Sequence, residues 1–309
     1  MTTSDTPHTS DAPGFPIGAN PWIWHSPVDG AALAETVPRL AAWGFDAVEL
    51  PLEQADDWDP AAVALLLARH GLTAAAVMAV MPPGRDLVAT DAATVKRTQE
   101  YLLRCVDSAE RVGAPVVAGP MYAAVGRTWR MTPDERAAAL AEWRDRLSPV
   151  VNHARAAGIT LGVEPLNRYE TSLLNTVAQT LEALEGLSAD AVGLCLDTYH
   201  QNIEETGLDT AVAQAAGRIA HVQVCANDRG TPGRDHLDWP AFLGALRAAG
   251  HTGPLCIESF TAHNDSIAVA ASVWRPLAPH QDAIAVEGLA FLRRALGRPA
   301  PTEGAIPHR

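Results

Sequence analysis

Short apolar runs recur along the chain, and a longer amphipathic or alanine-rich stretch separates each run from the next. We predict eight strands from these runs, at residues 17–24, 46–51, 72–80, 115–120, 159–164, 191–197, 218–225 and 254–259. The runs are continuously apolar rather than alternating, which is typical of strands buried on both faces of a parallel sheet. Eightfold alternation of strand and helix favours an α/β fold of the closed (β/α)8 TIM-barrel type over an open doubly wound sheet.

Helix boundaries support this division. The stretch 132–157 is predicted as a helix because Thr132 can cap it, Pro133 suits the first helical position and Glu135 completes a capping box. Glycines that would end the preceding helix stand just before three of the strands: Gly44, Gly71 and Gly158. The chain also lacks the GxGxxG and GxxxxGK[ST] phosphate-binding motifs, which weakens the open-sheet alternative.

The pattern predicts one catalytic domain over residues 16–297. Residues 1–15 are predicted to be a disordered leader, and the proline-rich residues 298–309 a flexible tail. The stretch 261–281 is predicted to be a long connection after the last strand, and such loops cover the active sites of barrels.

Composition narrows the classes of partner. Asp and Glu total 36 against 23 Lys and Arg, for a formal charge of −13, which argues against nucleic-acid and membrane partners. No apolar run reaches the roughly 18 residues of a membrane helix. The four cysteines form no CxxC pair, and three of them lie in predicted strands, as expected of reduced, buried thiols in a cytoplasmic protein.

Polar residues end the last four predicted strands or lie close to their ends. They are Glu164, Asp197, Gln223 and Glu258. Because barrel chemistry takes place where strands end, we expect these side chains to meet at the carboxyl-terminal mouth. Three carboxylates would repel one another there unless a cation lay between them, and oxygen donors favour Mn²⁺, Mg²⁺ or Co²⁺. Salt bridges at the barrel rim are the alternative interpretation.

Other residues are candidates for contact with a substrate. Glu49 is predicted to end its strand at the same mouth and to bind sugar hydroxyls, although a rim ion pair is an equal alternative. His200 follows Asp197 by three residues and can lean over the same pocket. Arg229 is a loop cation that can bind substrate oxygens or remain solvated. Trp24 is a candidate for stacking on the apolar face of a sugar, with a place in the core as its alternative.

Four strings in the later half of the chain carry a family resemblance. They are VEPLNRYETSLLNT (163–176), LDTYHQNIEET (196–206), HVQVCANDRGTPGRDHLDW (221–239) and IESF…SIAVAASVWRPL (257–277). They resemble the xylose-isomerase-like sugar isomerases and epimerases, and most of all the ketose 3-epimerases of the tagatose and psicose type. The resemblance spans residues 17–297.

The resemblance implies a metal-dependent isomerase that moves a proton next to a carbonyl through a cis-enediolate. It implies that Glu164 and Glu258 are both the acid/base pair and metal ligands, with Asp197 and position 223 completing the metal site. Glu170, His200 and Arg229 match positions that contact substrate oxygens. The implied cofactor is a divalent ion, Mn²⁺ first and Co²⁺ or Mg²⁺ next, and the implied assembly is a dimer or tetramer.

The chain departs from the ketose 3-epimerases at the fourth ligand. It carries Gln223 where they carry His, and in this it looks similar to hydroxypyruvate isomerase-like members. The Glu that follows this ligand in the epimerases is also absent, with Cys225 to Asn227 in its place. A lyase or epimerase that acts on 3-keto-glycosides or inosose-type ketones at the same metal site therefore stays open as an alternative function.

Overall fold

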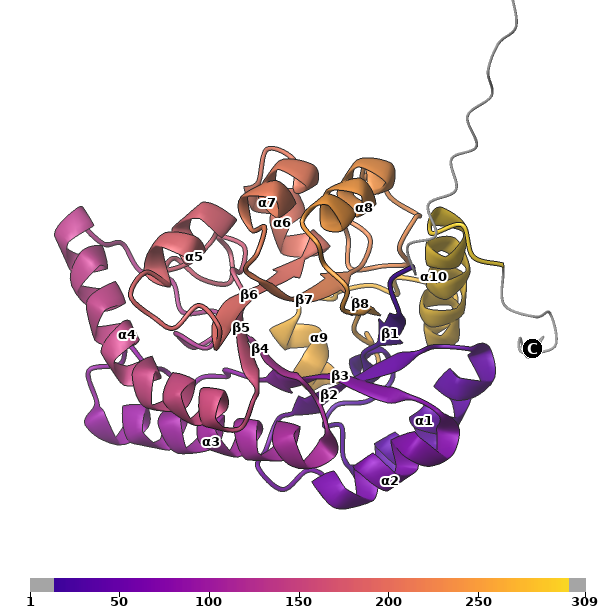
Figure 1. Cartoon of the computed structure of the whole chain (residues 1–309), viewed down its shortest axis with the longest axis horizontal. Coiled ribbons are helices and arrows are strands. Elements are labelled where there is room, and N and C mark those ends of the chain that lie inside the picture. The colour runs from indigo at the N-terminus through magenta and orange to yellow at the C-terminus, as the bar shows by residue number, and fades with distance from the viewer. Residues whose placement is uncertain (1–13, 300–309) are drawn as a thin grey trace, which may run out of the picture.

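Eight parallel strands close into a barrel in chain order within residues 14–299, the part of the chain that the computed structural model describes (Figure 1). The strands are β1 Ile17–Ala19, β2 Ala47–Leu52, β3 Thr73–Ala79, β4 Val116–Gly119, β5 Thr160–Val163, β6 Val192–Asp197, β7 Ile219–Val224 and β8 Leu255–Ile257. Closure comes from the pairing of β1 with β8, which leaves no strand edge open. All eight predicted strands are confirmed, and so is the single-domain TIM barrel.

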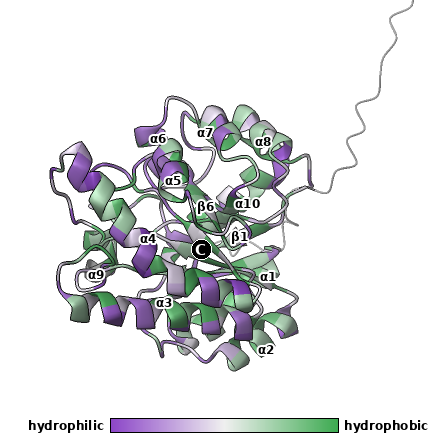
Figure 2. Cartoon of the chain, turned by 60° about the vertical axis from the view of Figure 1, so that its left-hand side comes forward, coloured by the Kyte–Doolittle hydropathy of each residue, from purple (hydrophilic) through white to green (hydrophobic). Residues whose placement is uncertain are grey.

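Helices surround the strand ring. They are η1 Pro21–Ile23, α1 Gly30–Trp43, α2 Pro60–His70, α3 Ala92–Val112, α4 Pro133–Ala156, α5 Val177–Ala183, α6 Thr198–Glu204, α7 Leu208–Gln214, α8 Trp239–Ala248, α9 Asp265–Ala270 and α10 Gln281–Ala295. Figure 2 shows hydrophilic residues on the outer sides of helices such as α3 and α4, with hydrophobic residues gathered on the strands. The core therefore lies between the strands and the inward faces of the helices.

The predicted start and stop signals behave as expected. At the start of α4 the Thr132 hydroxyl accepts from the backbone N–H of Glu135, whose carboxylate accepts from the backbone N–H of Thr132 at 2.7 Å. Gly44 and Gly71 end α1 and α2 in the left-handed region, and Gly158 follows α4 with a φ of 70°. These residues fix where each helix turns back to the next strand.

The edges of the predicted domain shift slightly. Phe15, placed in the leader, is 4% exposed and packs in the core. Arg298, placed in the tail, donates to the carboxylate of Asp46 and to the carbonyl of Phe15 at 3.1 and 3.2 Å. Both residues therefore belong to the folded barrel. The rest of the predicted leader and tail, apart from Gly14 and Pro299, is residues 1–13 and 300–309. These residues lie outside the described part of the chain.

Gly119 lies at the end of β4, next to the backbone of Glu164. It ends β4 with a φ of 136°, and its carbonyl accepts from the backbone N–H of Glu164 at 3.1 Å. A Cβ at this position would lie 2.4 Å from the backbone oxygen of Ala79. Only glycine fits both the backbone conformation and the space.

We therefore expect Gly119→Ala to destabilise the protein by roughly 2–5 kcal/mol, since backbone strain adds to a clash with backbone atoms. Urea unfolding measures this change. Gly126→Ala is the matched control, because Gly126 also has a positive φ of 86° but nothing lies near its added Cβ. Equal losses for the two variants would contradict the packing argument.

Candidate active site

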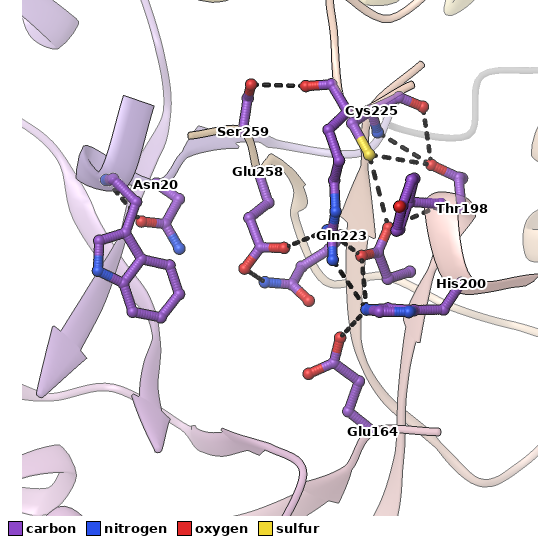
Figure 3. A network of polar contacts seen from close by, with 12 residues as sticks. Asn20, Glu164, Thr198, His200, Gln223, Cys225, Glu258 and Ser259 are labelled. Atoms are coloured by element: carbon purple, nitrogen blue, oxygen red, sulfur yellow. Dashed lines mark hydrogen bonds and ion pairs between the residues drawn. The ribbon is translucent and has the colours of Figure 1, made fainter. Parts of the chain in front are cut away.

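Four polar side chains predicted at strand ends come together at the carboxyl-terminal mouth of the barrel. Figure 3 labels three of them, Glu164, Gln223 and Glu258. Glu164 directly follows β5, Asp197 ends β6, Gln223 lies in β7 and Glu258 directly follows β8. All four are at most 5% exposed. The amide nitrogen of Gln223 donates to the Glu258 carboxylate at 2.6 Å. The convergence predicted from the sequence is therefore present.

Arg229 lies inside this group as its shared cation. Its Nη1 donates to Asp197 at 2.6 Å and to Glu258 at 2.7 Å. The guanidinium also lies over the rings of Tyr199 and Phe260, at 4.1 and 5.1 Å from their centroids. The side chain is 5% exposed, so the solvated alternative considered for Arg229 is wrong. Two carboxylates and two aromatic faces together hold this buried charge.

His200 is held in one tautomer. Its Nδ1 accepts from the backbone N–H of Asn167 at 3.0 Å, so the proton of the neutral ring is on Nε2. Burial, with the charge of Arg229, lowers the pKa of His200 well below its usual value and keeps the ring neutral. Nε2 lies 2.9 Å from Arg229 Nη2. Nε2 also lies 3.5 Å from a Glu164 oxygen and 3.6 Å from an Asp197 oxygen, so its proton faces the acidic group.

Glu170 extends the polar side of the site. Its carboxylate accepts from the side-chain amide of Asn167 at 2.8 Å. Burial raises the pKa of Glu170, which the Arg229 charge and the Asn167 hydrogen bond partly offset. Asn167 thus orients both His200 and Glu170, a role that the sequence analysis missed. Its signal was its place in the loop after a buried strand, three residues before Glu170.

A cavity of about 540 Å³ opens above these groups. Its polar lining includes Glu164, Glu170, His200, Arg229 and Glu258. Apolar residues form much of the remaining wall, among them Trp22, Met78, Leu166, Phe260 and Ile267. Residues of α9 and the segment after it contribute to the wall, so the long connection predicted at 261–281 does cover the site.

Two predicted substrate contacts are placed elsewhere. Glu49 is the third of six residues in β2 rather than its end, and it is fully buried inside the barrel without lining the cavity. Trp24 donates to Asp282 at 2.7 Å and packs against Trp43, on the α1 and α10 side. An apolar run does not reveal which of its residues ends the hydrogen-bonded strand. Trp22, two residues before Trp24, lines the cavity instead.

The carboxyl groups of the site titrate unusually. Burial raises the pKa of Glu164 well above its usual value, and the neighbouring Glu258 and Asp197 charges raise it further. Burial also raises the pKa of Asp197, and that of Glu258 to about 8, although Arg229 lowers both. The site without a cation thus retains protons at neutral pH.

These residues fit a divalent cation. Three carboxylates against one guanidinium leave two negative charges in a buried place, which one such ion would balance. Carboxylate oxygens suit a hard ion. Gln223 fits less simply, because its nitrogen faces Glu258 while its oxygen lies 3.5 Å from Cys195 Sγ. Its amide must turn over before its oxygen can face a cation.

The sequence matches a family model described as "Xylose isomerase-like TIM barrel" over residues 37–295. The chain belongs to this family. The strands β2 to β8, with all four converging residues, lie inside the matched range, and β1 precedes it.

Relatives within this family of xylose isomerase-like TIM barrels match over almost their full length. A ketose 3-epimerase of Arthrobacter globiformis is 32% identical over 282 residues, which cover 91% of this chain and 96% of the relative. A solved L-ribulose 3-epimerase has a TM-score of 0.84 at 31% identity and covers 92% and 95%. A D-allulose 3-epimerase from Methylomonas sp., solved in complex with D-allulose, has a TM-score of 0.82 at 27% identity and covers 91% and 97%.

Two further observations concern the helices and the cysteines. None of the helices in residues 14–299 combines the length and apolar character needed to span a bilayer. Cys105, Cys195, Cys225 and Cys256 are all free and buried, as expected for reduced thiols.

The titration of the site generates a prediction with a definite sign. A cation binds ionised carboxylates and must displace the protons that Glu164 and Glu258 retain. Affinity for Mn²⁺ should therefore rise from pH 6 to pH 8, by roughly tenfold per pH unit for each proton released. Over the same interval the metal-free protein should lose stability, because the folded state binds more protons than the unfolded state.

Isothermal titration in buffers of different ionisation enthalpy counts the released protons, and thermal unfolding of the metal-free protein follows stability. An affinity that stays flat from pH 6 to pH 8 would show that these carboxyl groups are already ionised.

Proposed function

We propose that this chain is a metal-dependent ketose 3-epimerase, an isomerase that inverts the carbon next to a ketone. The convergence of two acidic side chains, Glu164 and Glu258, on one buried cavity carries this proposal. The near full-length likeness to ketose 3-epimerases supports it. The substrate is a small ketose, in keeping with the D-allulose bound to the Methylomonas relative.

In this proposal the two carboxyl groups act from opposite sides of the substrate. Glu164 follows β5 and Glu258 follows β8, and Figure 3 shows their side chains reaching toward the space between them. One carboxylate removes the proton from the carbon next to the carbonyl, and the other carboxyl group returns a proton from the opposite face. Their raised pKa values suit groups that gain and lose protons near neutral pH.

The remaining polar residues position the ketose. The His200 Nε2–H and the Arg229 guanidinium point together and can donate to substrate oxygens, including the one that gains negative charge as the proton leaves. Glu170, fixed by Asn167, can accept from a hydroxyl. The ring centroids of Trp22 and Phe260 lie 5.6 Å apart, and the two rings offer apolar surface to the carbon face of the sugar.

Glu164, Asp197 and Glu258 would hold the ion, for which we propose Mn²⁺, with Co²⁺ and Mg²⁺ as substitutes. When bound, such an ion polarises the carbonyl and stabilises the charge of the enediolate. The fourth ligand predicted from the sequence, Gln223, would join them only with its amide turned over.

We also propose a cytoplasmic location and a dimeric or tetrameric assembly, which light scattering measures directly. The lyase or keto-glycoside alternative gains no specific support from the three relatives described above, all of which are named for 3-epimerisation of ketoses. Product mass separates a ketose 3-epimerase from a lyase, because an epimerase conserves the mass of its substrate. The class of substrate that is turned over, a free ketose or a keto-glycoside, separates it from a keto-glycoside epimerase.

Replacement of either acidic residue should abolish inversion while the fold is retained. We expect Glu164→Gln and Glu258→Gln each to lower kcat by at least about 10³-fold, since each loses a proton-transfer group and a negatively charged ligand. NMR of a ketose panel in D₂O measures both product and exchange. The wild type should place solvent deuterium at the inverted carbon. Ordinary turnover in either variant, or a product free of deuterium, would end this assignment.

Removal of the ion should stop the reaction reversibly. Incubation with a chelator and its removal should leave a folded, inactive protein, and Mn²⁺ or Co²⁺ should restore epimerisation, because the site then regains its missing charge. Circular dichroism checks the fold at each step. A chelated sample that keeps its full rate would contradict metal dependence.

A further inference from the structure

Below the cavity, a column of buried polar side chains runs through the barrel interior. It consists of Asn20, Glu49, His221, Gln223 and Glu258 and draws on the segments around β1, β2, β7 and β8. All five are at most 4% exposed. Only Glu258 among them lines the cavity. The proton transfer described above assigns no role to the lower members, although burial of a carboxylate such as Glu49 is costly.

Glu49 lies at the centre of this column. One of its oxygens contacts His221 Nε2 at 2.5 Å, and the other accepts from the Asn20 amide at 2.7 Å. That second oxygen also accepts from Gln223 Nε2 at 3.3 Å. Asn20 is itself held, because its oxygen accepts from the backbone N–H of Trp22. Glu49 is thus anchored on one side and presents an acceptor to Gln223 on the other.

The Gln223 amide bridges two carboxylates. Its Nε2 carries two hydrogens, one for Glu49 at 3.3 Å and one for Glu258 at 2.6 Å. Its oxygen accepts from the Cys195 thiol on the far side. When both carboxylates are ionised they only accept hydrogen bonds, so the amide atom between them is the nitrogen. The orientation of the amide therefore depends on Glu49.

We propose that Glu49 is a positioning residue that acts through Gln223 on Glu258. It fixes which atom of the amide faces the site, and thereby the direction in which the Glu258 carboxylate points. Groups behind the ligands of a metal commonly act in this way, and their loss costs about 10–100-fold in affinity or activity. This inference rests on the proposed function, and it replaces the sugar contact predicted for Glu49 with an indirect role.

A second ion at the column is the competing explanation. The donor atoms of Glu49, His221 and Cys256 lie within 4.8 Å of one another. His221 and Glu49 already satisfy each other, however, and burial raises the pKa of the Cys256 thiol well above its usual value, so it remains a weak ligand. One ion per chain is therefore the expected stoichiometry.

A double-mutant cycle tests the proposal. Glu49→Gln preserves shape but can present a donor to Gln223, and Gln223→Leu removes the bridge. We expect Glu49→Gln to lower kcat and Mn²⁺ affinity by about 10–100-fold and to leave KM for the ketose within about threefold, because Glu49 does not reach the cavity. In the Gln223→Leu background the same change should cost less than about threefold.

Trp58→Phe is the matched control. It removes a buried hydrogen bond to the backbone of β2, from Trp58 Nε1 to the carbonyl of Pro51 at 2.7 Å, without touching the column. It should lower the free energy of unfolding and leave Mn²⁺ affinity unchanged. If Glu49→Gln does not fold, His221→Gln carries the same cycle, since it weakens the anchor of Glu49.

Three outcomes would overturn the proposal. In the first, the Glu49→Gln and Gln223→Leu effects on kcat and Mn²⁺ affinity multiply independently. In the second, Glu49→Gln raises KM and leaves kcat unchanged. In the third, the wild type binds two ions and Glu49→Gln loses one of them. Mn²⁺ affinity needs no turnover, so this part of the cycle is informative even if the protein fails to epimerise any ketose. A failure to epimerise any ketose would contradict the proposed function and leave the positioning role of Glu49 in metal binding testable.

Discussion

The burial of like charges at one end of the barrel is the constraint on which the site depends. Glu164, Asp197 and Glu258 converge where water is largely excluded, and their raised pKa values reflect the energetic cost. Arg229 offsets part of the negative charge, and two negative charges remain when the carboxyl groups are ionised. Protons or a cation must make up the difference, so metal binding, proton binding and the basicity of the catalytic groups are linked properties of one site.

The barrel makes this concentration of charge possible. Closure gives every strand two neighbours, so no strand leaves an open edge. Consecutive parallel strands then deliver their last residues to the same rim. Below the rim, the column links β2 and β7, which do not pair with each other, through the side chains of Glu49, His221 and Gln223.

The sequence predicted most of the fold and the acidic members of the site because both depend on local pattern. Continuous apolar runs gave the eight strands, and the capping signals gave the bounds of α4 to within a residue. Glu164, Asp197 and Glu258 stood out because a carboxylate after several buried residues needs a reason. The same reasoning predicted that Glu49 ends its strand at the mouth and contacts the substrate, and this prediction was wrong. The strand predicted at 46–51 already continued past Glu49, and β2 extends to Leu52, which leaves the carboxylate inside the barrel.

The order of strands and helices, and the identity of the acids at the mouth, were therefore set by the sequence alone, since periodicity and strand polarity act over short distances along the chain. Tertiary structure decided the rest. The tautomer of His200, the burial of Arg229, the loss of Trp24 from the cavity and the facing of the Gln223 amide each depend on atoms dozens to hundreds of residues away. Hydrogen-bond direction and burial are properties of neighbours in space, and only the closed barrel determines which neighbours those are.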